Sequence, residues 1–392
     1  MDTNQFRQLL TKEGQWALES AVAFEPREQD FLGDFKMLAK RFERELARAA
    51  LTTAILRREA AVKFPQADKM YFTREALQQA SSWEVASYRA KRYAGFERVL
   101  DLGCSIGSDS LALAGAAPTL GIDIDPLRVA MAQANAQALN LPAEFIQADL
   151  NQLPVSGAPA AFFDPARRDE QGRVFSVRDY NPPLEIIRGW QARFPALGVK
   201  ISPGVKLNEI GDYDCEVEFI SLKGELKEAM LWFGPLKGEQ RFRATVLPGE
   251  HTLTASMDQP TLMLSEPRAY IYEPDPAILR AGLVGALGAQ LHAAQLDPTI
   301  GYLTADTRIE SPFARVWEVE DWLPFQLKRL RAAMRERNVG RLTVKKRGSP
   351  LVPEELIQDL RLEGEEEKVL FLTQQMGKPI VVIAKPNPVT PR

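Results

Sequence analysis

The sequence predicts an α/β protein built on a parallel sheet, with a helical region before it and a smaller α+β region after it. In residues 4–93 the apolar residues recur every three or four positions, which is the period of amphipathic helices. From Arg98 onward, short apolar runs alternate with longer helical patterns, as the strand–helix–strand units of a parallel sheet do. The 392 residues, of which 45% are apolar, are too many for one core and can fill several.

The central domain, residues 95–236, is expected to hold a seven-stranded sheet. Helices lie between the strands, among them Leu127–Leu139 and Leu184–Arg193, and Gly234 with Pro235 ends the last strand. Parallel strands joined by helices in this way form a Rossmann-like sheet. The expected strands are residues 98–102, 119–123, 144–148, 160–164, 198–201, 215–220 and 228–233.

Three further domains are expected around this sheet. Residues 1–94 are expected to form a helical domain. Residues 237–325 and 326–392 are expected to form two smaller α+β domains, because short strands and helices alternate there without the regular pattern of the sheet. Their expected elements are helices at Pro274–Leu291, Pro324–Arg337 (basic) and Pro353–Leu362 (acidic), and strands within residues 340–348 and 369–384.

Composition limits the classes of function. The formal net charge is −3, so any contact with nucleic acid must come from a local basic patch. Only two cysteines and two histidines occur, which argues against a zinc site, a disulfide framework and a Cys-His hydrolase. The polar start of the chain lacks the apolar core of a signal peptide, and no apolar run is long enough to cross a bilayer. We expect a soluble, cytoplasmic protein with no metal and no membrane partner.

A turn that can bind a ligand follows the first strand. Asp101 ends this strand, and Gly103, Ser105 and Gly107 lie in a turn of small residues before the next helix. Such glycines let the backbone turn tightly and approach a ligand closely. In dinucleotide enzymes this turn holds a pyrophosphate, but here Ser105 replaces the middle glycine and an acid precedes the turn. S-adenosylmethionine has an ammonium group and no phosphate, so it suits this turn, with Asp101 near its amino-acid end.

Three more acids follow the next three strands. Asp123 ends the second strand at the distance expected for a carboxylate that binds ribose hydroxyls. Asp149 follows the third strand and could accept a hydrogen bond from the adenine amino group, and Asp164 follows the fourth. Taken singly, each could be an ordinary aspartate that begins a turn. Together they face the carboxyl edge of the sheet, where open α/β folds bind ligands. The predicted cofactor-binding residues are Asp101, Gly103, Cys104 (as a small buried side chain), Ser105, Gly107, Asp123, Ile124, Asp149 and Leu150.

These motifs resemble those of class I methyltransferases, and more narrowly those of a bacterial family with a THUMP-like domain at the C-terminus. The runs Asp164-Pro-Ala-Arg-Arg168 and Glu273-Pro-Asp-Pro-Ala277 are the more specific matches, and the resemblance covers nearly the whole chain. It implies methyl transfer from S-adenosylmethionine, a ferredoxin-like unit in residues 237–325 and a THUMP-like domain in residues 326–392. The other matching runs are residues 73–79, 101–109, 121–126, 200–204 and 345–348.

The run Asp164-Pro165-Ala166-Arg167 is similar to the Asn/Asp-Pro-Pro-aromatic motif of methyltransferases that act on amino groups. In that motif, the acid or amide and a backbone carbonyl accept hydrogen bonds from the target NH2 and so orient its lone pair. The resemblance implies that Asp164, Pro165 and Ala166 form the catalytic turn. Because Arg167 replaces the aromatic residue, the usual ring that stacks on a base is missing. Arg167 and Arg168 are expected to hold a phosphate or to stack on a base.

Three other features bear on the transfer site. The run Asn181-Pro182-Pro183-Leu184 also matches the motif by letter, but it opens a helical pattern, so we interpret its prolines as those of a first helical turn. Lys200, on the next strand, is a substrate-facing cation, a partner of Asp164 or a lysine that reaches solvent. Neither Cys104 nor Cys215 stands in a motif for a catalytic thiolate, which argues against methylation of a pyrimidine carbon.

A basic cluster lies between Lys328 and Arg347, where Glu336 is the single acid. It could follow a phosphate backbone, or it could be a solvated face paired with the acidic segment Glu355–Glu367. Resemblance to THUMP-type RNA-binding modules favours RNA, with Lys345, Lys346 and Arg347 as predicted contacts. A second basic helix also contains acids and is interpreted as an ordinary exposed helix. Its cations are Lys40, Arg41, Arg44, Arg48, Arg57 and Arg58.

Three hypotheses follow from the sequence. The first is an S-adenosylmethionine-dependent methyltransferase that modifies a base nitrogen in structured RNA, either tRNA or rRNA. The second is a methyltransferase of small molecules or proteins, whose activity would survive nuclease treatment and charge reversal at Lys345, Lys346 and Arg347. The third is an RNA-binding protein whose methyltransferase fold no longer catalyses, which the altered motif after Asp164 leaves open.

Overall fold

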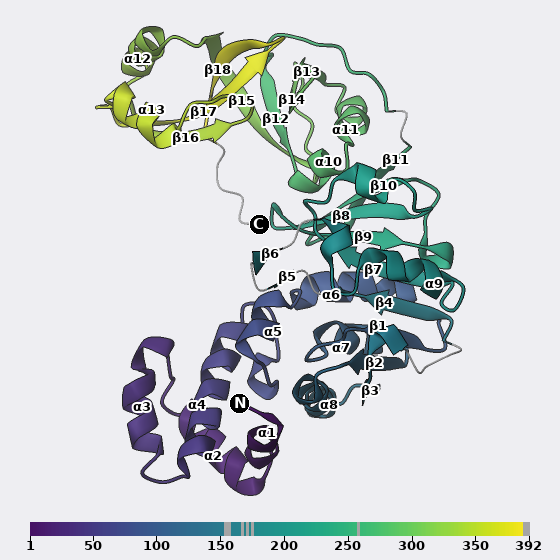
Figure 1. The fold of residues 1–392 in the computed structure, drawn as a ribbon. Coiled ribbons are helices and arrows are strands. Elements are labelled where there is room, and N and C mark those ends of the chain that lie inside the picture. The colour runs from purple at the N-terminus through teal and green to yellow at the C-terminus, as the bar shows by residue number, and fades with distance from the viewer. Residues whose placement is uncertain (153–157, 166–167, 170–171, 174–175, 257–258, 387–392) are drawn as a thin grey trace. The chain divides into compact units, whose positions relative to one another are not determined.

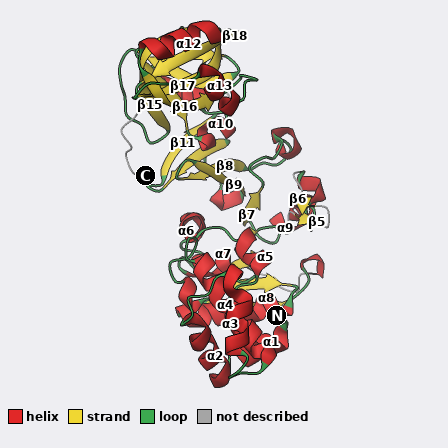
Figure 2. Cartoon of the chain, turned by 90° about the vertical axis from the view of Figure 1, so that its left-hand side faces the viewer, coloured by secondary structure: helices red, strands yellow, loops and turns green. Residues whose placement is uncertain are grey.

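The computed structural model describes residues 1–152, 158–165, 168–169, 172–173, 176–256 and 259–386. Within these residues the chain forms two compact units. The first unit is Met1–Glu216 with Ala229–Gly238, and the second is Val217–Glu228 with Glu239–Arg392. Helices make up the start of the first unit, whereas strands dominate the second (Figure 2).

The first unit begins with helices whose N-terminal ends are capped by side chains. Asp2 accepts a hydrogen bond from the Gln5 amide, and Gln5 in turn bonds the Asp2 amide, which is a complete capping box. Thr73 caps a later helix by accepting from the Ala76 amide at 3.1 Å. The helices are α1 (Thr3–Leu9), α2 (Lys12–Val22), α3 (Phe31–Leu38), α4 (Arg44–Ala60), α5 (Arg74–Gln79) and α6 (Trp83–Ala90) (Figure 1).

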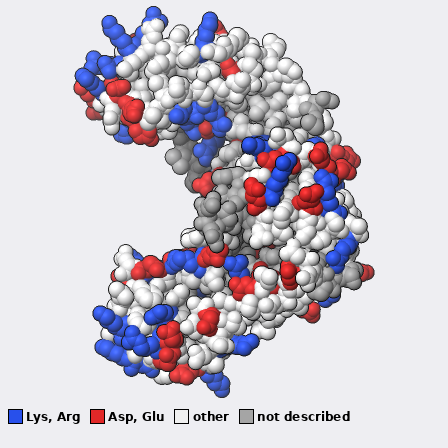
Figure 3. All heavy atoms as spheres, in the orientation of Figure 1, with Lys and Arg blue, Asp and Glu red and all other residues white. Residues whose placement is uncertain are grey.

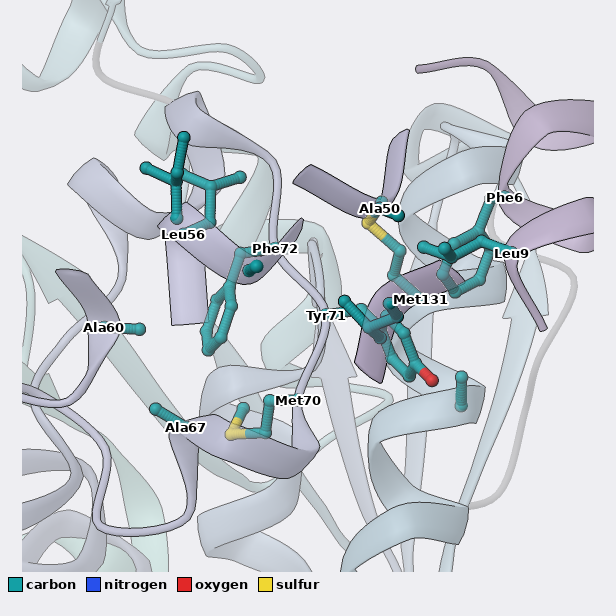
Figure 4. Close-up of a cluster of buried hydrophobic side chains, with 14 of the residues drawn as sticks. Phe6, Leu9, Ala50, Leu56, Ala60, Ala67, Met70, Tyr71, Phe72 and Met131 are labelled. Carbon is teal, nitrogen blue, oxygen red and sulfur yellow. The ribbon is translucent and has the colours of Figure 1, made fainter. Parts of the chain in front are cut away.

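These N-terminal helices share one apolar core with the helices α7 (Ser108–Ala114) and α8 (Pro126–Leu139) of the α/β part. Figure 4 shows Met131 of α8 among Phe6, Leu9 and Tyr71. Asn135 of α8 adds buried hydrogen bonds, because it accepts from the Tyr71 amide at 2.7 Å and donates to the carbonyls of Tyr71 and Ile106 at 3.1 and 3.0 Å. The helical segment is therefore packed against the α/β part.

The parallel sheet places the predicted site residues at one edge. In β1 (Val99–Leu102), Leu102 lies opposite Ile122 of β2 (Thr119–Asp123) and opposite Phe163 of β4 (Ala160–Phe163). Consequently Gly103, Asp123 and Asp164 come at the same level: Asp123 is the last residue of β2, and Gly103 and Asp164 directly follow β1 and β4. The strand order is β11-β10-β8-β9-β7-β4-β1-β2-β3. The remaining elements here are β3 (Ala143–Gln147), β7 (Ala196–Ile201), β8 (Glu216–Leu222), β9 (Glu225–Trp232), β10 (Phe242–Leu247), β11 (His251–Ala255) and α9 (Ile187–Gln191).

The second unit contains a seven-stranded sheet with the order β13-β14-β12-β15-β18-β17-β16. The helices α12 (Leu327–Glu336) and α13 (Pro353–Leu360) cover one apolar cluster that includes Leu330, Leu356 and Leu370. A separate cluster includes Tyr302, Trp317 and Phe371. The other elements are β12 (Tyr270–Pro274), α10 (Pro276–Arg280), α11 (Val284–Gln290), β13 (Ala294–Asp297), β14 (Ile300–Ala305), β15 (Ala314–Pro324), β16 (Val339–Lys346), β17 (Glu366–Gln375) and β18 (Lys378–Ala384).

The predicted fold class is confirmed, with differences in detail. The sheet has nine strands in place of the predicted seven, because β10 and β11 extend it beyond the predicted boundary at residue 236. The helix expected at Pro274–Leu291 is two helices, since Gly282 between them has a φ of +72°, which a continuing helix does not allow. The division into four domains stays a prediction; the seven-stranded sheet takes strands from both of the last two predicted domains.

Among the described residues, no helix is both long and apolar enough to span a membrane. Within the same residues, no group of three or more His, Cys, Asp or Glu is arranged to hold a metal ion.

Replacing Asn135 by Ala should lower the free energy of unfolding by about 2–4 kcal/mol, because the amide and carbonyl of Tyr71 and the carbonyl of Ile106 lose their buried partner. Urea denaturation would measure the change. The control is Gln137→Ala on the exposed side of the same helix, which should change stability by less than about 0.5 kcal/mol. Equal stability of the two variants would contradict the role given to Asn135.

Candidate active site

A cavity of about 500 Å³ opens at the carboxyl edge of the sheet in the first unit. The turn after β1 and the ends of β2, β3 and β4 contribute to its wall, which includes Gly103, Asp123, Asp149 and Asp164. Three acids from three different strands therefore meet in one cavity. This position is the one that open α/β sheets use for ligands.

The turn after β1 has the backbone that its glycines predict. Gly103 and Gly107 have φ values of +86° and +83°, which side chains rarely adopt. Ser105, between them, also has a positive φ of +51°. Its amide donates to Asp123 Oδ2 at 2.8 Å, and this bond holds the serine in a conformation that glycine would reach freely. The turn and the second strand are thus joined by one carboxylate.

Asp123 and Ile124 form the part of the wall that suits a nucleoside. The Asp123 carboxylate is 7% exposed and also accepts from the Asp125 amide at 2.9 Å. Each of its oxygens keeps a second lone pair, so it can still accept from ribose hydroxyls. Ile124 lies next to it and is 65% exposed, although it is a large apolar residue. A flat base packed on Ile124 would remove this apolar surface from water.

Asp149 and Leu150 lie on the same wall, after β3. Asp149 Oδ1 accepts from the amide and from the side chain of Asn151, at 2.9 and 3.0 Å. Asn151 itself reaches the cavity, as does the apolar side chain of Leu150. Carboxylate, carboxamide and apolar groups thus occur together here, which is the mixture that an adenine ring with an exocyclic amine requires.

Asp101 lies beneath the turn and is only 1% exposed, whereas Asp109 of α7 reaches the cavity wall. Ser110 Oγ donates to Asp101 Oδ2 at 2.5 Å, and Arg89 forms a 2.5 Å ion pair with Asp109. Burial, followed by the charge of Asp109, raises the pKa of Asp101 to about 8. The carboxylate at the wall is therefore that of Asp109, which is paired with Arg89, whereas Asp101 lies beneath the turn and stays protonated to a higher pH than usual.

Cys104 also lines the cavity, with a side chain 3% exposed. Burial, with the charges of Asp101 and Asp123, raises the pKa of this thiol well above its ordinary value. The thiol is therefore protonated at neutral pH and is not a nucleophile.

Asp164 and Lys200 form a buried ion pair at the end of β4. Lys200 Nζ donates to Asp164 Oδ2 at 2.5 Å, and the two side chains are 4% and 22% exposed. Of the three roles considered for Lys200, the structure has it paired with Asp164. The other oxygen, Asp164 Oδ1, is buried and has no hydrogen-bond partner among the residues that the structure describes. Because a buried acceptor without a partner is costly, this oxygen is suited to a donor that arrives with a ligand.

Other residues of the wall were not identified from the sequence. Asn181 and Pro182 line the cavity together with Asp164, and the single-turn helix that follows begins only at Leu184. The interpretation of Pro182 and Pro183 as prolines of a first helical turn is therefore wrong, because Pro183 only precedes that turn and Pro182 lines the cavity. Gln78 and Gln79 at the end of α5 also line the cavity. Their only signal in the sequence was the match of residues 73–79 to the family resemblance.

The remaining predicted residues fall into two groups. Ala166 and Arg167 lie outside the described residues, and Arg168 lies in a short strand, β5 (Arg168–Asp169), whose side chains are not described. In the second unit, Lys345 forms a 2.6 Å ion pair with Glu273 and lies over the Trp317 ring. This pair occupies the Lys345 ammonium. The other two residues of this group are Lys346, which is exposed, and Arg347, which is half-buried.

Three family models match parts of the chain. A methyltransferase domain matches residues 99–164, a THUMP domain-like module matches residues 314–386, and a domain of unknown function matches residues 2–60. Two uncharacterized S-adenosylmethionine-dependent methyltransferases, from two strains of Mycobacterium tuberculosis, are each 36% identical over 334 residues, covering 82% of this chain and 91% of the relative. The crystal structure of a proposed methyltransferase from Porphyromonas gingivalis W83 is 22% identical, with a TM-score of 0.78 over 93% of this chain and 100% of that chain, so the fold is the same.

The substitution Asp101→Asn should remove a pH dependence of stability. The pKa of Asp101 rises from 3.8 to about 8 on folding, so the ligand-free folded protein holds a proton there that the unfolded chain has lost. Stability should fall as pH rises through this window, by up to about 1.4 kcal/mol per unit, and level off above it. Denaturation of the wild type and the variant between these pH limits measures the difference, and equal slopes for the two proteins would contradict the assignment.

The substitution Asp123→Ala should weaken binding of S-adenosylmethionine roughly 10- to 100-fold, because hydrogen bonds to a charged carboxylate are lost and the turn at Ser105 is released. Calorimetric titration with the cofactor measures the affinity. Asp125→Ala is the control: Asp125 caps α8 by accepting from the Leu127 amide, so its loss should affect stability more than affinity. Equal affinity losses in both variants would argue against a ribose contact by Asp123.

Proposed function

The chain belongs to the S-adenosylmethionine-dependent methyltransferases, and we propose that it transfers the methyl group to a base nitrogen in structured RNA, either tRNA or rRNA. The observation that carries the choice of nitrogen is the buried Asp164 Oδ1, which has no partner in the described part of the chain. An exocyclic amine of a base has the N–H donors that this acceptor lacks, whereas a carbon target has none.

The cofactor supplies a methyl group on a sulfonium, which any sufficiently aligned nucleophile can accept. The protein's own contribution is then mainly orientation. Lys200 fixes the Asp164 carboxylate through Oδ2, so the lone pairs of Oδ1 are held in a fixed plane. An amine that donates to Oδ1 would present its lone pair away from the carboxylate. Pro165, which lines the cavity and has no amide N–H, does not compete for this acceptor.

A second polar group lies on the same wall. Asn181 is exposed at the cavity, together with Pro182, and its carboxamide can donate to a ring nitrogen or accept from an amine. Asp164-Pro165 and Asn181-Pro182 would then bind the Watson–Crick edge of a flipped base from two sides. These contacts would hold the base in position in place of the stacking ring, which is missing after Asp164.

The protonated thiol of Cys104 supports nitrogen over carbon as the target. Methylation of a pyrimidine carbon normally uses a thiolate that adds to the ring. Cys104 is kept neutral by burial, and Cys215 is also buried.

Exposed cations in the second unit support RNA as the substrate class. Lys328, Arg329 and Arg335 of α12 are exposed, as is Lys346 of β16. Figure 3 shows Lys and Arg side chains gathered where Figure 1 places α12. The match of residues 314–386 to a THUMP domain-like module points to RNA as well. By contrast, Arg331 bonds the Asp359 carbonyl and Arg337 pairs with Asp321, so these two cations have protein partners.

The variant Asp164→Ala should lower the rate of methyl transfer to RNA by roughly 100-fold or more while cofactor affinity changes little, because the acceptor that orients the amine is gone. Asp164→Asn keeps one oxygen, so its rate of methyl transfer should lie between those of the wild type and Asp164→Ala. The measurement is transfer of labelled methyl from S-adenosylmethionine to RNA extracted from cells that lack this gene.

The matched control for this assay is Asp212→Asn, which changes an exposed carboxylate of the same unit. It should keep wild-type activity. If the label were found in a small-molecule or protein fraction and survived nuclease treatment, the substrate would be a small molecule or a protein and not RNA. Cofactor binding without label in any fraction would favour a non-catalytic RNA-binding protein.

A further inference from the structure

We infer that the N-terminal helices carry a second RNA-binding surface, for an unpaired segment of the substrate, formed by Trp16, Lys36, Lys40, Arg41, Arg44 and Arg48. This cationic–aromatic face lies on α2, α3 and α4 and the connection between the last two. The inference rests on the proposed function, since it takes RNA as the substrate. It also revises the interpretation of this region as an ordinary exposed helix.

The five cations of the cationic–aromatic face are exposed and uncompensated. In the part of the chain that the structure describes, none of them forms an ion pair. The neighbouring acids have other partners: Glu43 caps α4 through the Leu46 amide, and Glu45 accepts from the Gln5 side chain. In Figure 3 the Lys and Arg side chains gather at the lower left, where Figure 1 places α3. A surface of this kind attracts a polyanion and releases counterions when it binds one.

The three arginines of this face lie over aromatic rings. The Arg41 guanidinium lies over Trp16 and Phe42, at 5.3 and 5.7 Å from the ring centroids. Arg44 and Arg48 both lie over the buried ring of Phe35, at 5.4 and 5.6 Å. Stacking restrains these side chains before any ligand arrives, and a stacked guanidinium still offers donors at its edge to phosphate oxygens. Less rotamer freedom is then lost on binding.

Trp16 distinguishes this surface from a purely electrostatic one. Its ring is 53% exposed, and its contact with Phe42 is edge-on, at a centroid distance of 4.9 Å. An exposed tryptophan among cations is a platform on which an unpaired base can stack, and such stacking is worth about 1–3 kcal/mol per base. The bases of a duplex are stacked on each other and cannot reach it. The chemistry therefore fits a loop or a single-stranded segment.

The cationic–aromatic face belongs to the same compact unit as the cavity. The α4 side chains Leu46, Ala50 and Ile55 share a core with Met131 of α8, and Asn135 bonds the backbone at Tyr71. Hence RNA bound to the cationic–aromatic face would be held on the unit that contains Asp164. The loss of this surface should weaken RNA binding and raise the RNA concentration needed for half-maximal methyl transfer, without lowering the maximal rate.

The first test is the salt dependence of RNA binding by the full chain. The double variant Lys36→Glu with Lys40→Glu should weaken binding of a labelled hairpin RNA about tenfold or more, and should reduce the slope of log affinity against log salt by between about one and two. The matched control, Lys69→Glu with Arg98→Glu, changes the same net charge on other exposed positions of the unit and should keep the wild-type slope. Equal slopes in the two double variants would overturn the proposal.

The second test isolates the tryptophan. Trp16→Ala should weaken binding of a hairpin with an unpaired loop by about 5- to 100-fold, and should leave binding of a blunt duplex with the same stem unchanged. Equal effects on both RNAs, or no effect on either, would overturn the proposal. It would also be overturned if the wild-type protein sedimented with anionic vesicles but did not bind RNA. A thermal scan of each variant confirms folding, and Trp16→Phe, which keeps a stacking ring, should restore most of the affinity.

The two proposals fail in different ways. If the wild type methylates RNA but the Lys36/Lys40 and Trp16 variants bind it normally, the proposed function holds and the cationic–aromatic face has no part in it. If these variants lose RNA binding while no RNA is methylated, the face stands as an RNA-binding surface and the proposed reaction is wrong.

Discussion

The parallel register of β1 with its neighbours is the constraint on which the site depends. Because Leu102 lies level with Ile122 and Phe163, the next residue of each strand reaches the same edge of the sheet. The glycine turn, Asp123 and Asp164 are then brought together by backbone hydrogen bonds, whatever their side chains do. Asp123 adds to this by accepting from the Ser105 amide, which joins the glycine turn to the second strand. A shift of one residue in either pairing would separate the groups that form the cavity wall.

The buried pair of Lys200 and Asp164 sets the chemistry at this edge. Lys200 is buried and needs a paired carboxylate, and it satisfies one oxygen of the half-buried Asp164. Among the described residues, the other oxygen has no donor. The Asp164 carboxylate is therefore held in place, and its Oδ1 can still accept a hydrogen bond from a ligand with an N–H group. Burial also keeps Cys104, in the cavity wall, and Asp101, beneath the turn, protonated up to a higher pH than usual. Groups in different environments thus differ in protonation state. A rigid site can therefore use some of them to bind a ligand and others to orient it.

The sequence predicted those features that depend on local pattern. The strand at Thr119–Asp123 and the positive φ of Gly103 and Gly107 follow from apolar runs and small residues, and both are observed. Features that depend on distant residues could not be read in this way. The depth of Asp101 below the turn and the pairing of Lys345 with Glu273, 72 residues away, are set by tertiary packing. The cavity position of Asn181 was missed because a proline run before a helix has a simpler local explanation. Likewise, the contact of Arg41 with Trp16 joins the connection between α3 and α4 to α2 and leaves no periodic signal.

The central claim, methylation of a base nitrogen in RNA, is tested most directly by the modified nucleosides of cellular RNA. RNA from cells that lack the gene would be digested and compared by mass spectrometry with RNA from the parent, and with RNA from cells that carry either the wild-type gene or its Asp164→Ala variant. The account predicts that one N-methylated nucleoside is lost, that the wild type restores it and that the variant does not. An unchanged set of methylated nucleosides in the deletion strain, or the loss of a C-methylated one, would contradict it.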